Sequence, residues 1–125
     1  MRIKTILAVD DTTNSLRTIK VVLEKDYRVL LAKTGEIALF ILQDTPVDLI
    51  LLDIDLPAMS GFDVLREIRK QPNVADTPVI FVTSHASGEI LQAAGELGVD
   101  DYIIKPILPT VLEKKIAAAL AAHAH

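Results

Sequence analysis

Five residues with reactive side chains each stand at the end of a short apolar run: Asp10, Asp11, Asp53, Thr83 and Lys105. If their side chains meet, two carboxylates about 5 Å apart repel each other by roughly 3 kcal/mol at an effective dielectric constant near 20. Lys105 offsets one of the three negative charges, and a divalent cation fits the remaining deficit. Oxygen ligands without a His or Cys cluster favour Mg²⁺, with Mn²⁺ as a second choice, over zinc.

The same set of groups suits the transfer of a phosphoryl group. A metal ion and an ammonium group neutralise phosphoryl oxygens, a hydroxyl donates to another oxygen, and positioning supplies most of the catalysis. Asp53 follows the run Leu49 to Leu52 and is our candidate nucleophile, because a carboxylate that attacks phosphorus forms an acyl phosphate. For a single Asp after a strand, capping the next loop or helix is the alternative role.

The elements before these residues must bring them together. Helical patterns, the last from Pro109 to about Ala122, alternate with strand-like apolar runs at residues 3–9, 27–32, 49–52, 78–82 and 102–104. The run at 49–52 is apolar on both faces, as in a central strand covered by helices on both sides. The alternation predicts an α/β fold with a five-stranded parallel sheet, whose strands all deliver their carboxyl ends to one edge. The fourth helical pattern is the weakest, with Gly95 inside it and Gly98 as its stop.

Length and composition set further bounds. A chain of 125 residues fits one domain, residues 1–125, and no apolar run approaches the roughly 20 residues of a membrane span. We therefore expect a soluble, cytoplasmic protein that does not bind a membrane; the absence of cysteine agrees with a reducing compartment. A net charge of -4 with scattered basic residues argues against a direct nucleic-acid surface. We expect no metal site at His123 and His125.

The chain resembles the receiver domain of bacterial two-component response regulators, the fold of the chemotaxis response regulator. The resemblance covers nearly the whole chain and rests on four segments in order: Ile6 to Asp11, Leu51 to Gly61, Pro78 to Ser84, and Gly98 to Pro106. It implies a doubly wound, flavodoxin-like (βα)5 fold in three layers. Any one segment is a weak signal, but four at compatible spacings make a strong one.

The resemblance also implies roles. Asp53 would accept a phosphoryl group from the phosphohistidine of a sensor histidine kinase or phosphotransfer protein. Asp11 and Asp53 would hold Mg²⁺ directly, Asp10 mainly through water, and Asp55 through its backbone carbonyl. Lys105 would pair with Asp53 and then with the phosphoryl oxygens, and its bond to the following proline would be cis.

The resemblance further implies a switch. Thr83 would turn its hydroxyl onto the phosphoryl group, and Tyr102 would swing inward behind it. The surface of the fourth helix, fifth strand and fifth helix would then control a downstream effector, and a dimer that forms on phosphorylation is a further option. The protein would be a regulatory phosphoacceptor that catalyses only its own phosphorylation and dephosphorylation.

Two other classes of function stay open. Asp53 and Asp55 have the D-x-D spacing of phosphatases and phosphotransferases with an aspartyl nucleophile, resembling the haloacid dehalogenase group, although that group's motif follows its first strand. A receiver-like scaffold that binds a partner without phosphorylation is the other class. The role of His85, two residues after Thr83, stays open as well, as does whether the chain is a single-domain regulator or part of a larger protein.

Overall fold

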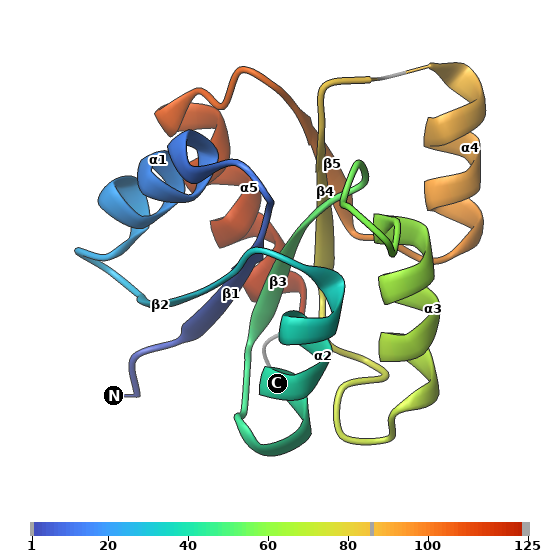
Figure 1. The fold of residues 1–125 in the computed structure, drawn as a ribbon. Coiled ribbons are helices and arrows are strands. Elements are labelled where there is room, and N and C mark those ends of the chain that lie inside the picture. The colour runs from blue at the N-terminus through green and yellow to red at the C-terminus, as the bar shows by residue number, and fades with distance from the viewer. Residues whose placement is uncertain (1, 86, 124–125) are drawn as a thin grey trace.

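Strands and helices alternate along the chain, in a computed structural model that describes residues 2–85 and 87–123 (Figure 1). The prediction for His125 falls outside these residues. The elements are β1 (Thr5–Val9), α1 (Thr13–Leu23), β2 (Arg28–Ala32), α2 (Gly35–Asp44), β3 (Leu49–Asp53), α3 (Gly61–Lys70), β4 (Val79–Thr83), α4 (Gly88–Glu96), β5 (Asp101–Ile104) and α5 (Pro109–Ala122).

The five strands form one parallel sheet in the order β2-β1-β3-β4-β5. Helices α2, α3 and α4 contribute buried side chains to the core on one face of the sheet, and α1 and α5 contribute to the core on the other. Figure 1 shows the resulting three layers, with α1 and α5 together on one side of the strands. The predicted doubly wound, flavodoxin-like α/β fold is confirmed.

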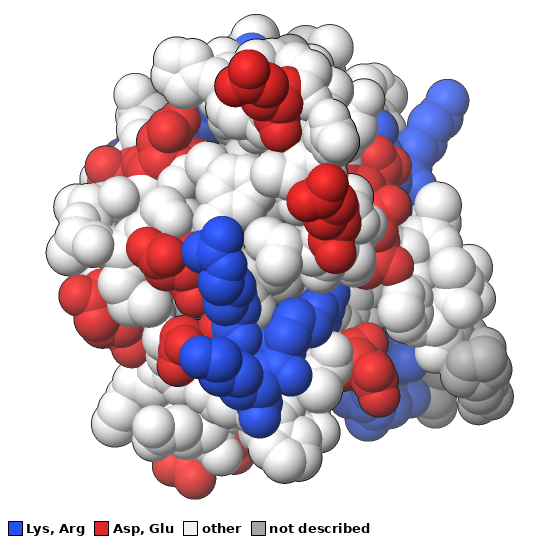
Figure 2. All heavy atoms as spheres, turned by 90° about the vertical axis from the view of Figure 1, so that its right-hand side faces the viewer, with Lys and Arg blue, Asp and Glu red and all other residues white. Residues whose placement is uncertain are grey.

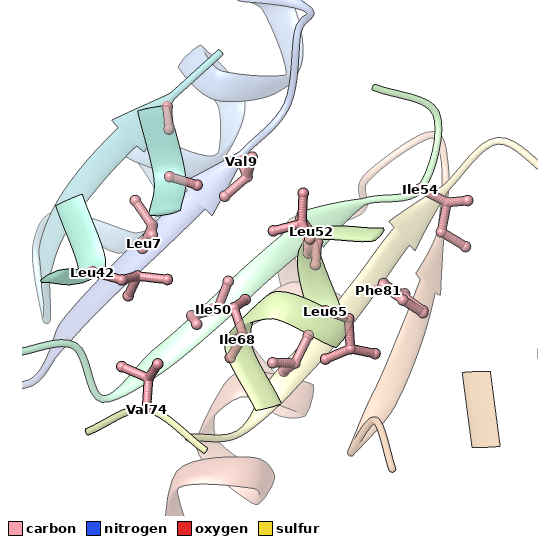
Figure 3. Packing of buried hydrophobic residues seen from close by; sticks show 14 of the residues in the cluster. Leu7, Val9, Leu42, Ile50, Leu52, Ile54, Leu65, Ile68, Val74 and Phe81 are labelled. Carbon is pink, nitrogen blue, oxygen red and sulfur yellow. The ribbon is translucent and has the colours of Figure 1, made fainter. Parts of the chain in front are cut away.

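Strand β3 lies at the centre of the sheet, and this position explains why residues 49–52 are all apolar. Its alternate side chains enter opposite cores: Ile50 and Leu52 pack on the side of α2 and α3, whereas Leu49 and Leu51 pack on the side of α1 and α5. Figure 3 shows Ile50 and Leu52 among side chains of the first of these cores (Figure 3). A strand covered on both faces needs apolar residues at every position, so its polar end residue stands out.

The loop from β3 to α3 is held close to the end of the central strand. Ser60 and Asp63 form a reciprocal capping box that starts α3. The Gly61 backbone N–H donates to the Ile54 carbonyl at 2.8 Å, and a Cβ at Gly61 would lie 2.4 Å from the Asp53 carbonyl oxygen. Only glycine permits this approach, which places the start of α3 directly against the end of β3.

The strand boundaries differ by one or two residues from the sequence prediction. Strand β1 begins at Thr5, because Ile3 is exposed and does not join the sheet. Helix α4 is as weakly anchored as its sequence suggests, with Ala94 as its one buried residue. It stops at Gly98, which has a φ of +76° and donates its N–H to the Gly95 carbonyl. No helix within the described ranges is long and apolar enough to cross a membrane.

Figure 2 looks onto the side of the molecule where α3 and α4 lie, and it shows Lys and Arg side chains gathered near Asp and Glu side chains. The basic residues of α3 have local partners. Arg69 donates to the backbone carbonyls of Ala75, Thr77 and Gly98 and so ties the loops before β4 and β5 together. Arg66 and Lys70 pair with acids one turn earlier on the same helix.

Candidate functional site

The carboxyl ends of β1, β3, β4 and β5 meet at one edge of the sheet, as predicted. Val9 pairs with Leu52 in the register of β1 and β3, so the next residues, Asp10 and Asp53, lie side by side. In the register of β4 and β5, Thr83 stands opposite Ile104, the residue before Lys105. Residues from distant parts of the sequence thus meet because neighbouring parallel strands end at the same level.

Three carboxylates gather at this edge. Asp10, Asp11 and Asp53 each offer an oxygen, and these oxygens lie within 4.8 Å of one another. Asp10 is 1% exposed and Asp53 is 3% exposed, whereas Asp11 is open to solvent. Backbone N–H groups orient the buried pair: Thr12 donates to Asp10 Oδ1 at 2.8 Å, and Asp55 donates to Asp53 Oδ1 at 3.1 Å.

Lys105 reaches the two buried carboxylates from β5. Its Nζ lies 2.9 Å from Asp10 Oδ2 and 3.2 Å from Asp53 Oδ2, and it donates a hydrogen bond to the latter oxygen. Its approach to Asp10 Oδ2 is short but outside hydrogen-bond geometry, and this buried oxygen accepts no hydrogen bond from the described residues. The peptide bond between Lys105 and Pro106 is cis, as the resemblance implied.

Burial and the neighbouring charges shift the pKa values of both Asp53 and Lys105. Burial raises the pKa of Asp53, and the neighbouring Asp10 carboxylate raises it further, while the Asp55 N–H and Lys105 lower it by less. Burial lowers the pKa of Lys105, but the close contact with Asp10 and the charges of Asp53 and Asp10 outweigh burial and leave the pKa raised. One shared ammonium therefore does not compensate the buried carboxylates fully.

The residues present fit a divalent cation. The three carboxylates carry three negative charges against the single positive charge of Lys105, and one buried oxygen, Asp10 Oδ2, has unused accepting capacity. Carboxylate oxygens with no nitrogen or sulfur ligand suit Mg²⁺ or Mn²⁺. The Asp55 side chain is exposed and outside the carboxylate cluster, so its expected contribution is limited to its backbone carbonyl.

The Thr83 hydroxyl is engaged within its own loop. It donates to the His85 carbonyl and accepts from the His85 N–H, both at 3.0 Å, and the residue is fully buried. The His85 imidazole points to the other loop of the site, where its Nε2 lies 3.7 Å from Asp55 Oδ2. His85 and Asp55, both exposed, therefore stand together at the rim above Asp53.

Tyr102 lies apart from the carboxylates. The residue is 36% exposed on β5, and the Lys115 ammonium lies 5.4 Å from the centroid of its ring while also pairing with Asp101 at 2.9 Å. A shallow hollow of about 210 Å³ adjoins the ring and is lined by Tyr102, Ile103, Ile104, Pro106, Leu108, Val111 and Lys115. Tyr102 is thus turned outward, onto the surface between β5 and α5.

Sequence reasoning did not foresee three features of the site. They are the Asp55 N–H that binds Asp53, the approach of His85 to Asp55, and the contact of Gly61 with the Asp53 backbone. The last left at most a weak signal: Gly61 directly follows the N-cap Ser60, but Gly88 follows the N-cap Ser87 in the same way and a Cβ there would meet nothing within 4 Å. The first two depend on loop conformation and left no pattern.

Comparison with known proteins identifies the family to which this chain belongs. The Response regulator receiver domain family matches residues 6–117. The chain belongs to this family. As a receiver domain it is a phosphoacceptor signalling domain, and the acidic pocket of Asp10, Asp11 and Asp53 occupies the edge of the sheet described above. Family membership decides against the phosphatase group raised by the D-x-D spacing.

The relatives are similar over nearly all of this chain. A probable cyclic di-GMP phosphodiesterase of Vibrio cholerae serotype O1 is 39% identical over 112 residues, which cover 90% of this chain and 25% of that protein. A CheY-like receiver domain protein from Methanospirillum hungatei JF-1 has a TM-score of 0.90 and 35% identity, covering 97% of this chain and 96% of that one.

A third comparison concerns the metal. The receiver domain of sensor histidine kinase PA1611 from Pseudomonas aeruginosa PAO1, solved with a magnesium ion coordinated in its active site cleft, has a TM-score of 0.87 and 29% identity. The similarity covers 96% of this chain and 99% of that one. The chain spans between a quarter and a half of the length of the first curated relatives it matches.

Proposed function

We propose that Asp53 is the phosphoacceptor of this receiver domain and takes its phosphoryl group from a phosphohistidine of a sensor histidine kinase or phosphotransfer protein. The observation that carries the proposal is the position of Asp53: it ends the central strand, is buried, and lies within reach of two further carboxylates and one ammonium group. Among the acids of the pocket, Asp53 alone combines this central position with a direct hydrogen bond from Lys105.

The proposed step forms one bond and breaks one. An oxygen of the Asp53 carboxylate attacks phosphorus, the bond from phosphorus to the histidine nitrogen breaks, and its electron pair returns to the imidazole. Lys105 pairs with the phosphoryl oxygens once Asp53 Oδ2 is no longer a free carboxylate oxygen. Attack of water on phosphorus then releases phosphate and restores Asp53. The domain would therefore catalyse only its own phosphorylation and dephosphorylation and turn over no other substrate.

We propose Mg²⁺ as the cofactor, with Mn²⁺ as a substitute. Asp11 and Asp53 would hold the ion directly, Asp10 mainly through water, and the Asp55 carbonyl would complete the protein ligands. When bound, the ion neutralises charge on the transferred phosphoryl group. The acidic cluster of this chain and the magnesium ion in the related PA1611 receiver support this proposal.

Phosphorylation would act through Thr83 and Tyr102. The new phosphate oxygens shift the population toward a state in which the Thr83 hydroxyl leaves His85 and binds them, provided that this state offers the better contacts. Tyr102, now exposed, would then move inward into the space behind Thr83. The surface formed by α4, β5 and α5 would change with it, and α4 is a suitable moving part because it buries so little.

The partners follow from this switch. The exposed apolar residues Tyr102, Ile104 and Leu108 on the surface of β5 and α5 would contact a downstream effector protein or domain, or a second receiver after phosphorylation. Residues 1–125 would act as a single receiver domain, alone or within a longer regulator. We place these partners in the cytoplasm, the location expected from the sequence.

One experiment tests the assignment of Asp53. The protein is incubated with Mg²⁺ and acetyl phosphate, and intact masses are compared for the wild type, Asp53→Ala and the matched control Asp55→Ala. We expect one added phosphoryl group on the wild type and the control and none on Asp53→Ala, and no addition to any of them in the presence of EDTA. Undiminished labelling of Asp53→Ala would place the acceptor elsewhere.

A further inference from the structure

The outward ring of Tyr102 has a cation against its face. The Lys115 ammonium lies 5.4 Å from the ring centroid, within the distance of about 6 Å at which the face of an aromatic ring attracts a cation. Apart from Lys115, the residues that line the hollow of about 210 Å³ beside the ring carry no charge. The ammonium is thus the charged partner of the ring on this side of β5.

Lys115 is itself anchored beside the ring. Its ammonium donates a hydrogen bond to Asp101 Oδ1 at 2.9 Å. The same carboxylate oxygen accepts from the Tyr102 backbone N–H at 2.8 Å. Asp101 therefore joins the backbone of Tyr102 to the cation that covers its ring. We call these three residues, Asp101, Tyr102 and Lys115, the Tyr102 tether.

The place of the tether in the sheet determines which position of the ring it stabilises. In the register of β4 and β5, Tyr102 stands opposite Phe81, which faces the core on the side of α3 and α4, and Thr83 follows two residues later on the same face. Helix α5 packs on the other face, so Lys115 reaches the ring around β5, the edge strand. Movement of the ring toward Thr83 carries it away from that edge and from the ammonium.

We propose that Lys115 is a positioning residue of the switch, which stabilises the outward ring of Tyr102 and so opposes the response to phosphorylation of Asp53. This inference rests on the proposed function, in which the ring moves inward behind Thr83. The inward ring gives up its contact with Lys115, whereas the ion pair of Lys115 with Asp101 can persist. A group that interacts with one of two states only shifts the equilibrium between them by the strength of that interaction.

The test is titration with beryllofluoride in the presence of Mg²⁺, which mimics a phosphoryl group on a carboxylate. Fluorine NMR of protein that carries 3-fluorotyrosine reports the ring of Tyr102, and Tyr27, the other tyrosine of the chain, serves as reference. We expect Lys115→Gln to lower the Kd of beryllofluoride by about two- to fivefold, the factor that a partly exposed cation–π contact supplies. The Tyr102 signal of the free variant should also move toward that of the saturated wild type.

Lys114→Gln is the matched control. It removes the same charge from the next residue of α5, which is exposed and forms no ion pair within the described ranges. Loss of a positive charge by itself weakens the binding of an anion, so this control should not lower the Kd. Lys115→Arg keeps a cation over the ring and should retain the Kd of the wild type. Thermal unfolding of each variant verifies that it is folded.

The outcomes separate the tether from the proposed function. A Kd that is unchanged or raised in Lys115→Gln overturns the tether, as does an equal fall in Lys114→Gln. The proposed function stands in that case, provided that acetyl phosphate still adds one phosphoryl group to both variants and none to Asp53→Ala. A wild type that accepts no phosphoryl group overturns the proposed function, and the tether with it.

Discussion

Removing the charge of Asp53 should stabilise the protein when no divalent cation is bound. The change is Asp53→Asn, which keeps the shape of the side chain and an oxygen that can accept from the Asp55 N–H. Asp53 is buried beside Asp10 and Asp11, and Lys105 is the cation that contacts it. A buried carboxylate whose compensation is incomplete is a source of instability, and the raised pKa of Asp53 has this sign.

The distances around Asp53 give the size of the expected stabilisation by Asp53→Asn. At an effective dielectric constant near 20, carboxylate oxygens within 4.8 Å of one another repel by about 3 kcal/mol or more, and an ammonium 3.2 Å away attracts by about 5 kcal/mol. Exposure of Asp11 screens its share of the repulsion, while burial of the Asp53 charge adds several kcal/mol of cost. With the hydrogen bond from Asp55 included, we expect Asp53→Asn to raise the free energy of unfolding by about 1 to 2 kcal/mol at neutral pH.

The direction in which stability changes with pH follows from the raised pKa of Asp53. Because the pKa of Asp53 is raised in the folded state, the folded protein binds a proton more readily than the unfolded chain. The free energy of unfolding therefore falls as the pH rises from 3.8, the ordinary pKa of Asp, through the raised pKa of folded Asp53. Above that raised pKa, the full destabilisation by the Asp53 charge is present. Asp53→Asn should remove this part of the pH profile.

The assay is urea unfolding in EDTA and again with Mg²⁺. Mg²⁺ at ten times its Kd should stabilise the wild type by about 1.4 kcal/mol and Asp53→Asn much less. Asp76→Asn, at an exposed acid far from the carboxylate cluster, is the control and should change little. An Asp53→Asn variant no more stable than the wild type in EDTA, or one that gains equally from Mg²⁺, would refute the reasoning.

Four further predictions concern three backbone positions and the ion pair of Asp48 with Arg2. Gly61→Ala should destabilise the protein by about 2 kcal/mol or more, because its Cβ would lie 2.4 Å from the Asp53 carbonyl oxygen. Gly95→Ala in α4, where a Cβ meets nothing within 4 Å, should instead stabilise by up to about 1 kcal/mol in the same urea assay. Ala58 has a φ of +65°, so Ala58→Gly should raise the free energy of unfolding by about 0.5 to 1 kcal/mol, and an unchanged urea midpoint would argue against strain at this residue. Burial raises the pKa of Asp48, but hydrogen bonds from Arg2 and from a backbone N–H outweigh it and leave the pKa lowered. The resulting stability is present above the ordinary pKa of 3.8 and is lost as the pH falls from there through the lowered value, so Asp48→Asn should flatten the acid limb of a stability profile.

The fold class and most residues of the site could be predicted from the amino-acid sequence. Alternating apolar runs and helical patterns require a parallel sheet, and parallel strands end at one edge. Asp10, Asp53 and Lys105, which follow or end three of the runs, are in contact at that edge, whereas the Thr83 hydroxyl stays within its own loop. The alternation gives the direction of the strands, and the resemblance to receiver domains implies their order, which the structure confirms.

The contacts and exposure of these residues, in contrast, could be read only from the folded protein. Asp10 and Asp11 are adjacent in sequence, yet the first is buried against Lys105 and the second faces solvent. The Thr83 hydroxyl binds its own loop at His85, and Tyr102 is turned outward. Such features depend on loop conformations and rotamers, which balance small energies between distant segments and leave no periodic pattern in the sequence.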